Sequence, residues 1–142
     1  MKKKKYELID KVDIVDGHTL YRIRALGNLR YVEKYDLGGW IESEDNLSHD
    51  GKCWVSGNAR VYGNARITGN ARVGGNAKVF GEAQVSENAR VFGSAQVFGN
   101  AHLIEMAWIC EETKLDSGIW DKSVHNHKWY IISTTLRKVL LR

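Results

Sequence analysis

The sequence predicts an all-β protein whose central part is a parallel β-helix, or β-solenoid, and three observations lead to this fold class. Ten six-residue units run from Gly51 to Cys110 without an insertion, and five of them begin Gly-Asn-Ala. Within each unit a small residue and a branched aliphatic residue stand two positions apart, so both side chains lie on one face of a strand. Glycine recurs at nearly every sixth position, which together with this alternation argues against a helix.

The two apolar positions of the unit are expected to fill a narrow triangular interior. The small position holds Cys53, Ala59, Ala65, Ala71, Ala77, Ala83, Ala89, Ala95, Ala101 and Ala107. The larger position holds Val55, Val61, Ile67, Val73, Val79, Val85, Val91, Val97, Leu103 and Ile109. Glycine and asparagine at the start of a unit tolerate the positive φ that a sharp corner needs. Three units make one coil, so residue i is expected to stack on residue i+18 at about 4.8 Å.

The chain is expected to divide into three segments. They are an N-terminal β-hairpin cap at residues 1–38, a hexapeptide-repeat β-helix at residues 39–116, and a C-terminal cap or oligomerisation arm at residues 117–142. The β-helix segment has room for about four coils, and looser units from Gly39 precede the regular ones. Caps are expected because an open coil end exposes apolar core and unpaired backbone.

Each terminal segment has its own sequence signal. Tyr6 to Val15 and His18 to Leu26 read as two strands around Asp16-Gly17, a dipeptide typical of a hairpin turn. The C-terminal segment is rich in large apolar side chains that must be buried on the last coil or on another protomer. Residues 133–142 fit a short helix or an extended arm equally well.

The repeat resembles that of the hexapeptide-repeat, left-handed β-helix superfamily. More narrowly, GNARVYGNARITGNARV is similar to the small GNAxV-repeat proteins of phages, prophages and gut bacteria, and so is the lead-in at residues 36–48. The resemblance implies a left-handed coil, a homotrimer, and an accessory protein that works in a bacterial host.

Stacking of each coil on the next sorts the outward side chains into three walls. The first wall carries an aromatic column of Tyr62, Phe80 and Phe98, which we interpret as the oligomer interface because exposed apolar strips mark interfaces. The alternative is that these rings only stabilise strand pairing. The second wall carries Arg66, Gln84 and His102 and reads as ordinary solvated surface.

The third wall is the candidate ligand-binding surface. Its residues are Trp54, Arg72, Arg90, Phe92 and Trp108. Two arginines stacked on each other repel unless water, a carboxylate or an anionic ligand lies between them, and Gly74 is expected to leave a dent beside them. Guanidinium groups bind phosphate bidentately and aromatic faces stack on bases, so the wall predicts an anionic, nucleotide-like ligand. The alternative is a cation–π ladder with no ligand.

No catalytic residue, metal or cofactor is predicted. Acyltransferases of the superfamily use a histidine base and long inserted loops, whereas the ten regular units have no insertion and His102 lies on the second wall. An acyltransferase remains the enzymatic alternative. His125 and His127 form a lone His-X-His without a third ligand at a recognisable spacing.

These observations predict a non-catalytic, oligomeric binding protein. We expect a phage or prophage anti-defence protein that sequesters an anionic nucleotide-like ligand or blocks a host protein, with a structural or assembly module as the alternative. A cytoplasmic location is expected, because the basic N-terminus lacks an apolar stretch after it and two cysteines make no disulfide framework. The net charge of +4 permits an anionic partner, but neither a membrane nor a nucleic acid polymer is expected.

Overall fold

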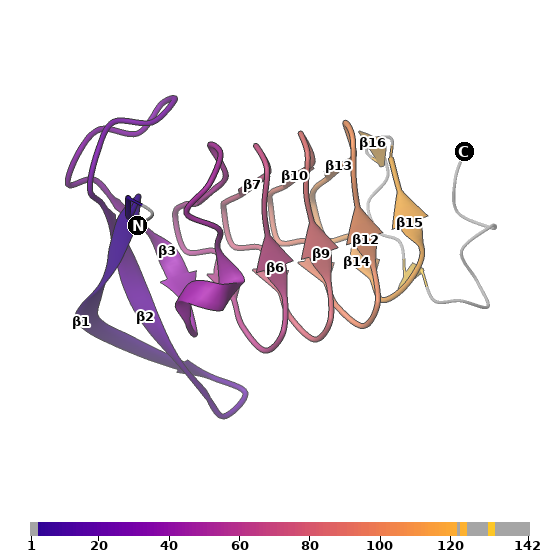
Figure 1. Cartoon of the computed structure of the whole chain (residues 1–142). Coiled ribbons are helices and arrows are strands. Elements are labelled where there is room, and N and C mark those ends of the chain that lie inside the picture. Colours follow the sequence, from indigo (N-terminus) through magenta and orange to yellow (C-terminus); the bar gives the residue numbers. More distant parts are fainter. Residues whose placement is uncertain (1–2, 122, 125–130, 133–142) are drawn as a thin grey trace.

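The protein is a parallel β-solenoid of about four coils, and the computed structural model describes residues 3–121, 123–124 and 131–132 (Figure 1). Short strands stack into the three expected walls. The first wall contains β5 (Arg60–Val61), β8 (Lys78–Val79), β11 (Gln96–Val97), β14 (Lys114–Leu115) and β17 (Ile131–Ile132). The second wall contains β6 (Arg66–Ile67), β9 (Gln84–Val85), β12 (His102–Leu103) and β15 (Ile119–Trp120). The third wall contains β4 (Trp54–Val55), β7 (Arg72–Val73), β10 (Arg90–Val91), β13 (Trp108–Ile109) and β16 (Ser123–Val124).

The interior is the one that the repeat predicts. Every alanine of the small position is at most 1% exposed, and the aliphatic residues of the larger position are fully buried. The corners adopt positive φ, as at Gly75, where φ is 65° and an added Cβ would lie 2.9 Å from the carbonyl oxygen of Gly93. Neighbouring coils therefore pass too closely at this corner for a side chain. The left-handed sense of the coil stays a prediction from the resemblance.

The predicted stacking register holds from β4 to β14 but not in the coil before β4. Trp54 pairs with Arg72, one full coil of three units later, as the repeat requires. Trp40 pairs instead with Arg60, which lies two positions beyond the residue that the repeat predicts. The expectation of regular stacking from Gly39 is therefore wrong by two positions. The short 3-10 turn η1 (Glu44–Asn46) lies between the first two walls and keeps this offset, because Leu47 after it bridges to Ile67. The two extra residues therefore lie between Leu47 and Trp54, where the offset returns to one coil.

Asn46 explains why the chain makes this turn. Its side chain is buried, and its Oδ1 accepts from the backbone N–H groups of Glu42 and Ser43 at 3.0 and 2.9 Å. Its Nδ2 donates to the carbonyl oxygens of Gly63 and Ala65 on the next coil. One asparagine thus ties the irregular first coil to the regular second one.

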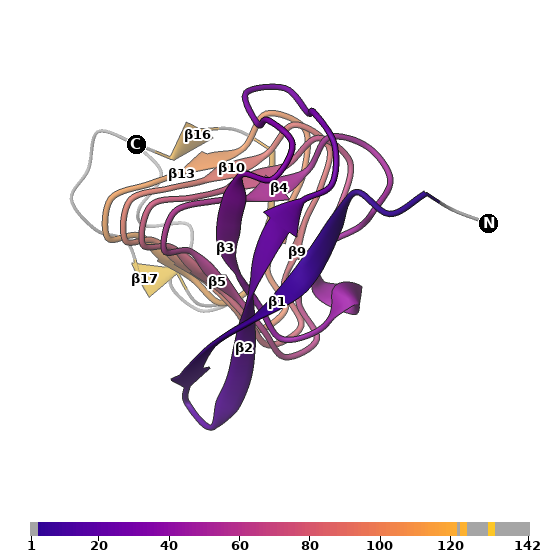
Figure 2. The ribbon, with the colours of Figure 1, turned by 90° about the vertical axis from the view of Figure 1, so that its left-hand side faces the viewer.

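The N-terminal hairpin extends the first wall. β1 (Tyr6–Val15) and β2 (His18–Ala25) pair antiparallel around Asp16 and Gly17, whose φ values of 52° and 83° suit the predicted hairpin turn. β2 pairs antiparallel with β3 (Leu37–Ile41), and β3 pairs parallel with β5. The order β1-β2-β3-β5 therefore continues the sheet of the first wall, and the hairpin projects sideways from the solenoid (Figure 2).

Residues 26–36, here called the 26–36 loop, connect β2 to β3. A bridge between Leu29 and Val32 closes its tip, and Tyr31 at that tip has a φ of 66°. Val32 is buried, which anchors the loop to the core, whereas Tyr31 is exposed. The loop rises above the end of the solenoid in Figure 1.

Parallel pairing continues beyond the regular units. β15 pairs with β12 through His102 and Ile119, one position short of a full coil, and β16 pairs with β13. The alternatives for residues 133–142 fall outside the described residues.

Candidate functional site

The third wall brings four of the predicted residues into one column. Trp54 pairs with Arg72, Arg72 with Arg90, and Arg90 with Trp108 in successive parallel strands. Phe92 lies two residues after Arg90, so its side chain points outward on the same wall. The two arginines are therefore direct neighbours on adjacent coils, at a strand spacing of about 4.8 Å.

Two residues of this wall differ from the expectation. Trp54 is only 3% exposed, because the ring of Tyr6 packs edge-on against it at 6.4 Å. Gly74 leaves no dent, since a Cβ there would lie 2.6 Å from the ring of Phe92 and 2.8 Å from the hydroxyl of Ser56. Trp54 and Gly74 are therefore structural, and of the two tryptophans Trp108, 44% exposed, is the one that reaches solvent.

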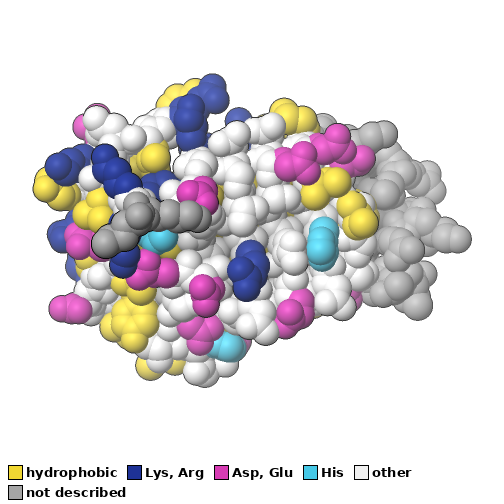
Figure 3. All heavy atoms as spheres, viewed as in Figure 1, with side chains coloured by type: hydrophobic (Ala, Val, Ile, Leu, Met, Phe, Trp, Pro, Cys, Tyr) yellow, Lys and Arg dark blue, Asp and Glu magenta, His cyan; other side chains and the backbone are white. Residues whose placement is uncertain are grey.

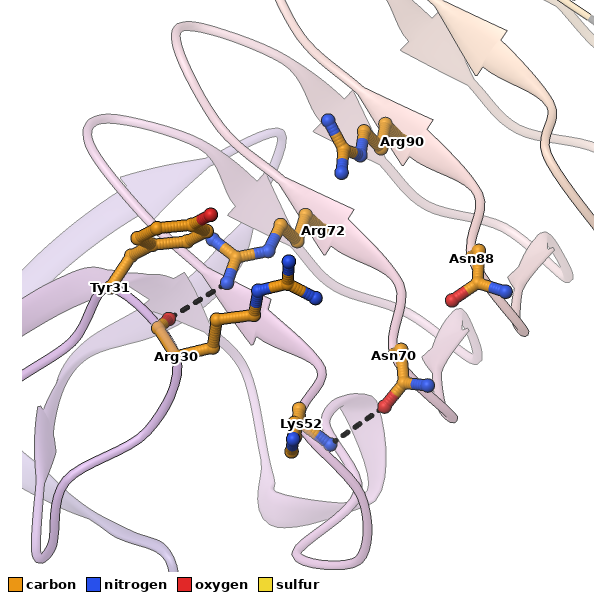
Figure 4. A pocket seen from close by; sticks show the side chains of 7 residues that line it. All are labelled: Arg30, Tyr31, Lys52, Asn70, Arg72, Asn88 and Arg90. Carbon is orange, nitrogen blue, oxygen red and sulfur yellow. Dashed lines mark hydrogen bonds between the residues drawn. The ribbon is translucent and has the colours of Figure 1, made fainter.

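The arginine pair opens instead into a hollow of about 140 Å³ beside the 26–36 loop (Figure 4). Three elements meet there: the third wall, the corner between the second and third walls, and the tip of the loop. The residues that line the hollow are Arg30, Tyr31, Lys52, Asn70, Arg72, Asn88 and Arg90. Four of these seven side chains carry a positive charge.

Contacts with the loop fix the position of Arg72. Its guanidinium donates to the carbonyl oxygen of Arg30 at 2.7 Å and lies 5.0 Å from the centre of the Tyr31 ring. Burial lowers the pKa of Arg72, and the charges of Arg90 and Arg30 lower it further. Arginine stays protonated at neutral pH even so, which leaves a half-buried cation that is repelled by both neighbours.

The corner supplies the floor of the hollow. Lys52, Asn70 and Asn88 follow one another along this corner, each one coil after the last. The backbone N–H of Lys52 donates to Oδ1 of Asn70 at 3.3 Å. The amide group of Asn70 therefore keeps its Nδ2 as a donor beside Lys52, which also lines the hollow.

These cations differ from Arg24 and Arg60, each of which is neutralised by a carboxylate. Arg24 donates to the carboxylate of Glu7 at 2.8 Å, and Arg60 donates to that of Asp13 at 2.7 Å. Within the described part of the chain, no carboxylate forms a salt bridge with any of the four cations that line the hollow. Figure 3 shows that basic side chains gather at this hairpin-bearing end of the molecule.

Sequence reasoning found part of this site. Arg72 and Arg90 follow from the repeat, and the same spacing would have joined Lys52 to Asn70 and Asn88. Arg30 and Tyr31 had no comparable signal, because their approach depends on how the 26–36 loop folds over the wall.

The first wall carries the predicted aromatic column. The ring centres of Tyr62 and Phe80 lie 5.1 Å apart and those of Phe80 and Phe98 lie 5.0 Å apart, in both cases with the planes 3° from parallel. Tyr62 is only 2% exposed, because the ring of His18 covers it and its hydroxyl donates to Asp16 at 2.8 Å. Phe80 and Phe98 are therefore the members of the column that a partner protomer can reach.

Two histidines of the described residues contact carboxylates, and none belongs to a cluster that could bind a metal ion. His18 contacts Glu42 at 3.0 Å, and His49 contacts Glu44 at 2.7 Å while its ring stacks on Tyr6. Residues 3–121, 123–124 and 131–132 contain no group of three His, Cys, Asp or Glu that could hold a metal ion. His125 and His127 lie outside these ranges.

Comparison with known proteins identifies the type of repeat. Residues 55–69, 59–75 and 83–99 match the family model described as YdcK Beta solenoid repeat. These stretches lie within the regular units, and together with the observed coils they support a repeat β-helix family. No curated protein matches the chain. No helix within the described ranges has the length and apolar character needed to cross a membrane.

Proposed function

We propose that the protein is a non-catalytic binding protein that captures an anionic, nucleotide-like ligand in the hollow of the third wall. The observation that carries this proposal is the group of four cations, Arg30, Lys52, Arg72 and Arg90, without a carboxylate among the described residues that line the hollow.

The electrostatics of the hollow favour an anion. Like charges on directly opposed strands destabilise a sheet, and Arg72 and Arg90 occupy such a pair. A ligand with two negative charges removes that repulsion and gains charge-assisted hydrogen bonds from both guanidinium groups. The lining residues that the structure describes are donors and one phenol ring, with no carboxylate or imidazole to act as a base. The chemistry supplied is therefore that of binding.

The resemblance of the repeat gives this activity a setting. A phage or prophage accessory protein that captures a nucleotide signal would weaken a host defence, and such a protein would work in the cytoplasm of the bacterial host. We propose a homotrimer for this protein, with Phe80 and Phe98 in the interface because they are half-buried whereas Tyr62 of the same column is fully covered.

Calorimetric titration tests the proposal. The ligands are a cyclic dinucleotide, a linear dinucleotide and ADP-ribose, and the variant is Arg72→Ala/Arg90→Ala. Each charge-assisted contact contributes about 1.5–3 kcal/mol, so the double variant should bind at least about a hundredfold more weakly. Arg66→Ala is the matched control, since Arg66 occupies the same position of a unit on the second wall.

Two results would contradict the proposal. Binding that the double variant leaves unchanged would move the site away from the third wall. An absence of binding by all three ligands would favour a blocked host protein or a structural role.

A further inference from the structure

We infer that the hollow takes a nucleoside diphosphate group, with two adjacent phosphates on Arg72 and Arg90 and the base on the ring of Tyr31. This inference rests on the proposed function and names the chemistry of its ligand. The group occurs both in nucleoside 5′-diphosphates and in pyrophosphate-linked dinucleotides, which present the same two recognised parts.

The arginine pair sets the number of phosphates. Arg72 and Arg90 are register partners on adjacent parallel strands, so their backbones stand about 4.8 Å apart. Each guanidinium can hold one phosphate through two parallel hydrogen bonds. Two phosphates that share a bridging oxygen lie close enough together for each to bind one of these neighbouring guanidinium groups. A single phosphate would leave the second guanidinium group without a phosphate.

The total charge of the hollow also favours a ligand with two phosphates. Arg30 and Lys52 add two further cations to the arginine pair, and Asn70 and Asn88 add amide donors at the corner. A monophosphate would leave most of this charge uncompensated. A diphosphate can extend from the arginines toward Lys52, with the amide group of Asn70 beside it.

Arg72 is held in place before a ligand arrives. Its hydrogen bond to the carbonyl oxygen of Arg30 and its contact with the ring of Tyr31 restrict the guanidinium on one side. A restrained guanidinium loses less side-chain entropy when it binds a phosphate. The 26–36 loop therefore contributes to affinity through Arg72 as well as through its own residues.

Tyr31 provides the surface for the base. Tyr31 is 80% exposed and has a φ of 66° at the tip of the loop, and the guanidinium groups of Arg72 and Arg30 lie 5.0 and 5.3 Å from its ring centre. An exposed ring fixed beside a phosphate site is suited to stacking on a nucleobase. Tyr35 of the same loop is 61% exposed but is absent from the lining of the hollow, so it is a matched control.

Calorimetric titration with orthophosphate, pyrophosphate, AMP and ADP tests this inference on the full chain. For the wild type we expect ADP to bind at least about tenfold more tightly than AMP, because the second phosphate adds a charge-assisted contact. Arg90→Ala should remove most of that difference, whereas Arg66→Ala should keep it. Tyr31→Leu should weaken AMP and ADP by a similar factor and pyrophosphate by a smaller one, because pyrophosphate loses only the restraint on Arg72. Tyr35→Leu should change none of them.

The outcomes separate this inference from the proposed function. Equal affinity for AMP and ADP, with both weakened by Arg72→Ala, would overturn the diphosphate assignment and leave the anion site standing. ADP binding that Tyr31→Leu does not affect would overturn the assignment of the base. Failure of all four probes together with the dinucleotides would overturn both proposals.

Discussion

The first and third walls are built from the same repeat, yet their outward side chains differ in the partners that stabilise them. On the first wall, the rings of Tyr62, Phe80 and Phe98 stack on one another, and Arg60 is paired with Asp13. On the third wall, Arg72 and Arg90 occupy the positions that Arg60 and Lys78 hold on the first wall, and they repel each other without a carboxylate partner among the described residues. The first column is stabilised by the chain itself, whereas the second is suited to an anion from outside.

The difference comes from the segment that covers each wall. The β1-β2 hairpin brings the carboxylates of Asp13 and Asp16 to the first wall, where they accept hydrogen bonds from Arg60 and Tyr62. The 26–36 loop brings Arg30 and Tyr31 to the third wall, which adds a cation where a carboxylate would have neutralised the site. A regular solenoid thus acquires the proposed binding surface through the irregular residues placed against it.

The largest effect is expected for a charge placed in the first-wall column. Phe80→Asp puts a carboxylate between Tyr62 and Phe98, and burying it unpaired in the proposed trimer interface costs several kcal/mol. Light scattering should show a smaller assembly for this variant. Gln84→Asp, which places the same charge on the second wall, should keep the wild-type assembly. A monomeric wild type would contradict the homotrimer.

A smaller effect is expected in the interior that all three walls share. Ala83 is fully buried, so Ala83→Leu should lower the free energy of unfolding by about 1–3 kcal/mol through overpacking. Ala83→Ser adds one atom and should be much milder. Thermal unfolding compares the two, and a leucine tolerated like the wild-type alanine would show that this position has more room than its burial indicates.

A still smaller effect is expected at the paired arginine of the first wall. Arg60 and Asp13 form an ion pair whose side chains are 29% and 30% exposed. Such a pair contributes up to about 1 kcal/mol, so Arg60→Ala should lower the free energy of unfolding by that amount in denaturant titrations. Asp13→Asn should have a similar effect, and the double variant should cost less than the sum. Additive effects would mean that the two residues do not act as a pair.

The sequence was sufficient to predict the regular coils but not the positions of the N-terminal segments that pack against them. The six-residue period fixes the buried alanines and the Arg72–Arg90 pair, because stacked coils leave no choice of register. The irregular first coil depends on contacts between coils, such as the two hydrogen bonds from the buried Asn46 to Gly63 and Ala65, which the six-residue period does not predict. The burial of Trp54 likewise depends on Tyr6, which is far away in the sequence.

The most direct test of the comparison is the thermal unfolding of Arg60→Ala and Arg90→Ala, each with and without pyrophosphate. Arg60→Ala should lower the Tm in both conditions and keep the rise that pyrophosphate gives the wild type. Arg90→Ala should leave the free energy of unfolding within about 0.5 kcal/mol of the wild type without pyrophosphate and lose most of that rise, which mass action ties to affinity. An Arg90→Ala variant that is destabilised as much as Arg60→Ala, or that keeps the full rise, would contradict the account of the third wall as a binding site.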